Sequence, residues 1–148
     1  MKFTLSALLT LFSTYSFADS QIEFSAFIQE GCLKPVESLA REYLKEHEDE
    51  VNQKLSRRSF MPFKIDLGSI SVCGVHSLEP GSFDVLRETR ICGLAFASKD
   101  SKQLLSSDPR VILFAEVVLL TRGDLYCTNE EVIELQSVKL SGKPVQNF

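Results

Sequence analysis

The sequence has few histidines and lacks the common catalytic motifs. Its 148 residues include two histidines, His47 and His76, and no tryptophan. Two histidines exclude a histidine-rich metal site. The sequence also has no Gly-x-Ser-x-Gly, no glycine-rich phosphate-binding loop and no His-Glu-x-x-His. We therefore expect a protein that is not an enzyme, with no catalytic residues, no metal site and no cofactor.

An excess of positive charge and long apolar runs are also missing. Sixteen basic residues face 20 acidic ones, which gives a formal net charge of −4. This balance argues against nucleic acid or an anionic membrane as the main partner. After residue 18 the longest apolar run, 111–120, is interrupted by Glu116 and is too short to span a bilayer. We expect no membrane span in the mature chain, and another protein as the partner.

Residues 1–18 have the features of an export signal. Lys2 supplies a positive start, and residues 3–12 are mostly apolar. Ser16 and Ala18 place small residues at the −3 and −1 positions that signal peptidase recognises. The sequence therefore predicts a signal peptide over 1–18, a mature chain that begins at Asp19, and a bacterial protein that is periplasmic or secreted.

The four cysteines of the chain are Cys32, Cys73, Cys92 and Cys127. An even number of cysteines in an oxidising compartment predicts two disulfides, for which three connectivities are open. Cys73 and Cys92 fall in neighbouring strand-like segments, which favours their pairing and leaves Cys32 to bond Cys127. The alternative is a redox or catalytic thiol. It is less favoured, because the sequence has no Cys-x-x-Cys and no histidine adjacent to a cysteine.

A long helix is predicted over residues 35–56. Pro35 suits the first helical position, and apolar residues recur at three- and four-residue steps along the segment. Within this helix, Tyr43, His47 and Glu50 share one face and could supply two ligands to a cation. Two ligands do not close a metal site, so we interpret the acidic segment 46–50 as a solvated helix surface. The preceding segment 21–30 fits either a short helix or a strand.

The chain after residue 60 has the pattern of β-structure. Apolar and polar residues alternate over 63–67, and the alternation changes parity at Gly68-Ser69, which predicts a bulge. Further strands are predicted at 90–97, at 111–120, and as one strand or two within 125–140. Gly123-Asp124 predicts a tight hairpin turn. Residues 99–109 read as a polar loop and 141–148 as a loose tail.

This order predicts an α+β domain over residues 19–140, with one long N-terminal helix packed on a curved antiparallel sheet of about four strands. The layout resembles the cystatin-like and NTF2-like architectures. Residues 71–75, Ser-Val-Cys-Gly-Val, stand where a cystatin has its Gln-x-Val-x-Gly sequence, but Ile70 occupies the place of the glutamine and the Pro-Trp pair is absent. The resemblance implies a fold, and it does not extend to protease inhibition by the cystatin mechanism.

Glu116 is the most informative polar residue, because it interrupts an apolar strand. A buried carboxylate must be paired or have a raised pKa, and such groups are enriched at functional sites. If the sheet curls into a pocket against the helix, Glu116 would line it with Phe96, Phe114 and Tyr126. In the alternative, Glu116 lies on the outer sheet face opposite Arg90, and the apolar residues of the same parity form a protein interface there.

The absence of catalytic motifs favours a binding module that acts by contact in the cell envelope, as inhibitors and immunity proteins do. One alternative is an NTF2-like pocket protein that binds a small apolar ligand, and another is a structural subunit of an envelope assembly. The space between helix and sheet separates the first two hypotheses, because a pocket protein needs that space open.

Overall fold

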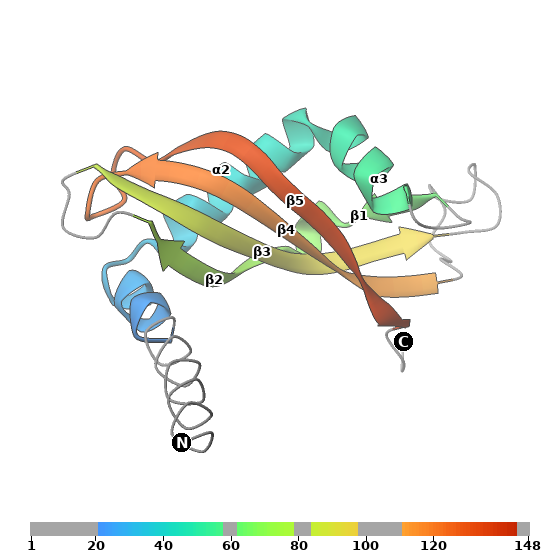
Figure 1. The fold of residues 1–148 in the computed structure, drawn as a ribbon, viewed down its shortest axis with the longest axis horizontal. Coiled ribbons are helices and arrows are strands. Elements are labelled where there is room, and N and C mark those ends of the chain that lie inside the picture. The colour runs from blue at the N-terminus through green and yellow to red at the C-terminus, as the bar shows by residue number, and fades with distance from the viewer. Residues whose placement is uncertain (1–20, 58–61, 79–83, 98–110, 145–148) are drawn as a thin grey trace, which may run out of the picture.

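The computed structural model of the chain describes residues 21–57, 62–78, 84–97 and 111–144. The predicted signal peptide and the predicted polar loop at 99–109 lie outside these residues. Within them, the helices over residues 33–56 pack on one face of a curled antiparallel sheet, as Figure 1 shows. The α+β class predicted from the sequence is thus confirmed. Among the described helices, none is both long enough and apolar enough to cross a membrane.

The segment that the sequence left undecided is helical over residues 21–29, and we call it the first helix. It ends in a turn centred on Gly31, whose φ of 76° favours glycine. The N–H of Gly31 bonds the Ile28 carbonyl at 3.0 Å, and the N–H of Cys32 bonds the Phe27 carbonyl at 3.1 Å. This pair of bonds is the Schellman arrangement, which satisfies the last carbonyls of a helix. The turn leads directly into the next helix.

The prediction of one long helix over 35–56 is wrong, because two helices occupy this stretch. They are α2, Leu33–Glu46, and α3, Glu48–Ser56. His47 separates them with φ −110° and ψ 26°, and its ring nitrogen Nδ1 lies 2.9 Å from the Tyr43 carbonyl oxygen. The acidic residues Glu48, Asp49 and Glu50 then occupy the first turn of α3, where the helix dipole favours negative charge. The break lets α2 contact β2 and β5 while α3 contacts β1 and β5.

The sheet is built on β3, which runs over Val85–Ala97. On one side β3 pairs with two short strands, β1 (Phe63–Ile65) and β2 (Ser71–Ser77). On the other side it pairs with β4 (Val111–Gly123), which pairs in turn with β5 (Glu131–Pro144). All neighbours are antiparallel, so the long strands follow one another as a meander.

Three details of the predicted strands differ from the structure. A 3-10 turn over Leu67–Ser69 stands where a bulge was predicted, and the β2 bulge falls instead between Val72 and Gly74. The predicted tight hairpin is replaced by a longer connection, residues 124–130, in which the positive φ of 59° belongs to Cys127. The predicted tail from residue 141 begins inside β5, because pairing with β4 continues to Pro144.

The space between the helices and the sheet is filled by the hydrophobic core. We call this side of the sheet the helix-covered face and the opposite side the open face. Leu44 of α2 and Val51 of α3 have no exposed surface, and neither do Val117 and Leu119 of β4. Close packing here provides the main stabilisation of the fold. Other members of this core include Val36, Ala40, Leu55, Val72, Ile91, Ala95 and Ala115.

The structure contains both disulfides in the pairing that the sequence favoured, Cys32–Cys127 and Cys73–Cys92. Cys32–Cys127 is buried and joins the turn after the first helix to the connection 124–130. Cys73–Cys92 is half-buried and joins the β2 bulge to β3 on the open face. The two bonds therefore differ in how easily a reagent reaches them.

We expect a mild reductant to cleave Cys73–Cys92 before Cys32–Cys127, because accessible disulfides exchange with thiols more readily. Native protein would be treated with increasing reductant, alkylated and mapped by mass spectrometry. Labelled peptides containing residues 73 and 92 should appear first. Earlier labelling of residues 32 and 127 would show that accessibility does not order the two reactions.

Candidate interaction surface

The edge of the sheet formed by β1 and β2 is closed by side chains of the helices. Asn52 of α3 accepts a hydrogen bond from the Ile65 N–H at 3.0 Å, and Ser56 accepts one from the Phe63 N–H at 2.8 Å. The first helix does the same for β2, where Glu23 accepts from the Ser77 N–H at 3.2 Å. Because these N–H groups are already bonded, they cannot pair with a strand of another chain.

The opposite edge, β5, is protected in a different way. Its pairing with β4 shows three register shifts, and irregularities of this kind bend an edge strand out of pairing geometry. Glu131, Glu134 and Lys139 also expose charges along it. Both edges therefore disfavour strand addition.

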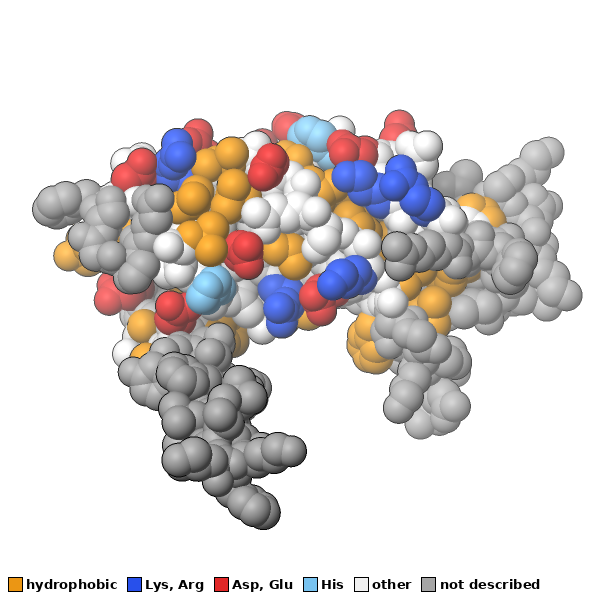
Figure 2. All heavy atoms as spheres, in the orientation of Figure 1, with side chains coloured by type: hydrophobic (Ala, Val, Ile, Leu, Met, Phe, Trp, Pro, Cys, Tyr) orange, Lys and Arg blue, Asp and Glu red, His pale blue; other side chains and the backbone are white. Residues whose placement is uncertain are grey.

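The open face carries three of the four residues that the sequence singled out, Phe96, Phe114 and Glu116. Register places Phe114 of β4 opposite Leu94 of β3, and Phe96 opposite Ile112. Phe114 is 53% exposed. Figure 2 shows hydrophobic and charged side chains intermixed on the side of the molecule turned to the viewer. None of these four described apolar residues belongs to the hydrophobic core beneath the helices or is packed against it.

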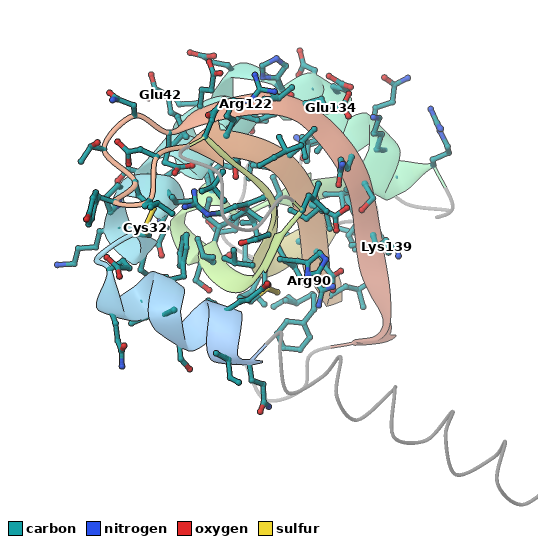
Figure 3. All side chains as sticks on the ribbon, turned by 60° about the vertical axis from the view of Figure 1, so that its left-hand side comes forward. Cys32, Glu42, Arg90, Arg122, Glu134 and Lys139 are labelled. Atoms are coloured by element: carbon teal, nitrogen blue, oxygen red, sulfur yellow. A yellow bond between two sulfur atoms is a disulfide. The ribbon has the colours of Figure 1, made fainter. Side chains whose placement is uncertain are left out.

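Glu116 belongs to a row of charges on the open face. Its carboxylate lies 3.4 Å from Nε of Arg90 on β3, and Lys139 of β5 is its direct partner in register. Arg90 and Lys139 are labelled in Figure 3 on the two strands that flank β4. This is the outer-face alternative from the sequence, with Glu116 in a half-exposed ion pair.

Tyr126 lies away from the other three predicted residues. It belongs to the connection 124–130 and is 69% exposed. The predicted pocket that would join Glu116, Phe114, Phe96 and Tyr126 between helix and sheet is not formed. The side chains of Glu116, Phe114 and Phe96 lie on the open face of the sheet, not between the sheet and the helices. The space under the helices is filled by core residues such as Leu44.

Most of the exposed large apolar side chains of the described residues lie on the first helix or in segments beside it. The described residues include seven large hydrophobic side chains that are exposed, and five of them lie on the first helix, at the end of β2, or in the connection 124–130. We call this region the first-helix end. Its exposed apolar residues are Ile22, Ile28, Leu78, Leu125 and Tyr126. Ile22 and Ile28 were missed from the sequence, because the structure of segment 21–30 was undecided.

Two clefts flank the first helix. The His76 cleft has a volume of about 370 Å³ and opens on the open face, with a lining that includes Phe24, Cys73, His76, Glu88 and Arg90. The Tyr126 cleft has a volume of about 410 Å³ and lies between the first helix and the connection 124–130. Its lining includes Glu23, Ala26, Phe27, Glu30, Leu125 and Tyr126. Nδ1 of His76 lies 3.4 Å from the Glu23 carboxylate, and this contact joins the helix to β2.

A buried ion pair fixes the connection 124–130 to the sheet. Nη1 of Arg87 on β3 lies 2.5 Å from Oε1 of Glu130, and Nη2 donates to the Asp124 carbonyl at 3.0 Å. The Glu130 side chain is 3% exposed, and its Oε2 has no hydrogen-bond partner among the described residues. Burial raises the pKa of the Glu130 carboxyl above its ordinary value, although the neighbouring Arg87 acts in the opposite direction.

Asp124 organises the start of the same connection. Its Oδ1 accepts hydrogen bonds from the N–H groups of Tyr126 at 3.0 Å and Thr128 at 2.9 Å, and its Oδ2 accepts from the Thr128 hydroxyl. These hydrogen bonds lower the pKa of the Asp124 carboxyl, and the bond from the Thr128 side chain has the largest effect. Together with the Cys32–Cys127 disulfide they present Leu125 and Tyr126 on a preorganised loop.

The acidic segment 46–50 has the character of a helix surface. The His47 ring stacks on Tyr43 with ring centres 4.0 Å apart, and Glu50 pairs with Lys54 at 3.3 Å. The described residues contain no group of three or more side chains that could hold a metal ion.

Comparisons of the chain with protein-family models, with curated proteins and with solved structures found no match. The resemblance to the cystatin-like and NTF2-like architectures therefore stays a prediction of layout.

Proposed function

We propose that this chain is an exported, disulfide-stabilised protein that acts without catalysis, by binding another protein through its first-helix end. The observation that carries the proposal is that five of the seven exposed large apolar side chains of the described residues, and two clefts, lie on or beside the first helix. Exposed apolar patches with polar rims are typical of protein interfaces. The buried Arg87–Glu130 pair and the Cys32–Cys127 bond support the same proposal, since a fixed loop loses less entropy on binding.

Export is supported by the predicted signal at 1–18 and by the two disulfides, which persist in oxidising compartments. In the envelope or outside the cell, the protein would act as an inhibitor or an immunity protein does, by occupying a surface of its target. The alternative of an NTF2-like pocket protein receives less support, because Leu44, Val51 and Leu119 fill the space between helices and sheet.

A second candidate function is a subunit of an envelope assembly that uses the open face. The observation that favours it is the cluster of Leu94, Phe96, Ile112 and Phe114, which face one another across β3 and β4. This surface and the first-helix end can be tested in one experiment, because each contains exposed residues whose replacement spares the core.

The test captures partners from an envelope extract of the source organism with tagged wild-type protein and matched variants. We expect one partner to be retained by wild type and by the open-face variant Phe114→Ser, and lost by the double variant Leu125→Ser/Tyr126→Ser. Circular dichroism and thermal unfolding confirm that each variant is folded. Loss with Phe114→Ser alone would favour the assembly subunit, and recovery of no partner by wild type would contradict the binding proposal.

A further inference from the structure

The Tyr126 cleft has an apolar lining that suits an aliphatic stem. Phe27, Val75 and Val85 line it and are each at most 6% exposed, so they form its floor. Leu125 and Tyr126 line it as well, with much of their surface exposed at its mouth. The stems of lysine and arginine side chains pack along such surfaces while their charged heads stay near water.

The charges around the Tyr126 cleft are mainly negative. Glu23 and Glu30 line it, and no lysine does. The Glu23 carboxylate is engaged by the Ser77 N–H and His76, which leaves Glu30 as the carboxylate open to a ligand. Glu30 follows the last residue of the first helix, where the helix dipole is negative and attracts cations. Arg87 is the one cation in the lining, and its guanidinium is already bound to the Glu130 carboxylate and the Asp124 carbonyl.

The Cys32–Cys127 disulfide brings Glu30 and Tyr126 to the same rim. The Cα atoms of Cys32 and Cys127 are 5.3 Å apart, and Glu30 and Tyr126 closely precede these two cysteines in the chain. Both residues line the Tyr126 cleft, so this rim offers a cation a carboxylate and an aromatic ring. Both contacts favour a cation, the first by charge and the second through the negative face of the ring.

We propose that the Tyr126 cleft holds a lysine or arginine side chain of the partner protein, with the charged head at Glu30 and Tyr126 and the stem on Leu125 and Phe27. The identity of the partner rests on the proposed function, whereas the preference of the cleft for a cation does not. A carboxylate or phosphate ligand fits poorly, because it would pass Glu23 and Glu30 to reach an arginine whose charge is already balanced.

The experiment titrates full-length, disulfide-bonded mature protein with N-acetyl-lysine methylamide and with its neutral isostere, N-acetyl-norleucine methylamide, followed by ¹⁵N NMR. We expect the lysine probe to shift amide signals of residues 23–30 and 125–127 at millimolar concentrations. It should bind about tenfold more tightly than the isostere, as expected for an exposed ion pair combined with a cation–π contact. Glu30→Gln and Tyr126→Leu should each reduce this preference to about threefold. Glu131→Gln removes a similar exposed charge outside the cleft and should leave the preference for the lysine probe unchanged.

Equal binding of the two probes, shifts confined to the open face, or tighter binding of N-acetyl-aspartate methylamide would overturn the inference. Its failure and that of the proposed function are distinguishable. If the double variant Leu125→Ser/Tyr126→Ser loses the partner while Glu30→Gln and added salt do not weaken capture, the proposed function stands and the cationic anchor is wrong. If the lysine probe binds as expected while the double variant retains the partner, the cleft takes cations and the proposed contact surface is wrong.

Discussion

Replacing Cys32 and Cys127 together by alanine is expected to lower the free energy of unfolding by about 4–5 kcal/mol. The bond joins residues 95 positions apart, so its loss frees a long loop in the unfolded chain. The matched control is the Cys73→Ala/Cys92→Ala variant, whose bond spans 19 positions and whose removal should cost about 3 kcal/mol. Urea denaturation of the three proteins measures both differences.

The same replacement should also loosen the first-helix end. Cys32–Cys127 is the covalent bond between the first-helix turn and the connection 124–130, so hydrogen exchange should accelerate in both segments. In the control variant these segments should keep their protection. If hydrogen exchange in these two segments accelerated as much in the control variant, the Cys32–Cys127 bond would not be the main constraint on this end of the molecule.

Replacing Glu130 by alanine is expected to cost about 3–5 kcal/mol, because it leaves the Arg87 guanidinium buried without its counter-charge. Gly123→Ala should have an effect of the same size through the same pair. A Cβ at position 123 would collide with the Glu130 carboxylate and displace it from Arg87. In the double variant Gly123→Ala/Glu130→Ala, the cost should be close to that of Glu130→Ala alone.

Gly74→Ala is the matched control for this cycle. A Cβ at position 74 meets Cβ of Arg90 at 3.6 Å, an ordinary van der Waals distance, so the change should cost less than about 1 kcal/mol. Denaturation of the single and double variants gives the coupling energy between positions 123 and 130. Additive costs would show that Gly123 acts on stability independently of the ion pair.

The sequence predicted the features of the fold that depend on local patterns. Alternation indicated the strand that begins at Phe63, and the continuous apolar run 111–120 indicated a central strand. The placement of Cys73 and Cys92 in neighbouring strand-like segments favoured the disulfide pairing. The break at His47 could not be predicted, because α2 and α3 both bury apolar residues, such as Leu44 and Val51, whose spacing is continuous with one helix. The break is set by the backbone conformation of His47 and by the packing of α2 and α3 on different strands.

The candidate site was predicted only in part, because some of its residues are far apart in the sequence. Glu116 and Phe114 share a strand parity, so their common face followed from the sequence. The pairing of Arg87 with Glu130 could not be predicted from the sequence, because the two residues are 43 positions apart. Arg87 shares the parity of buried Thr89 and Ile91, and this signal could have marked it as an inward-facing charge. The first-helix end escaped prediction because a segment as short as 21–29 has too few turns to separate helix from strand.

The central claim is that a partner protein contacts the first-helix end, and site-specific photocrosslinking tests it most directly. A benzophenone amino acid would replace Tyr126 in one protein and Phe114 in another, both expressed in the source organism and irradiated there. Both positions are exposed aromatic residues, so the substitution is comparable in size and setting. We expect a covalent adduct with one partner from position 126 and none from position 114. An adduct from position 114 alone would contradict the claim and place the interface on the open face.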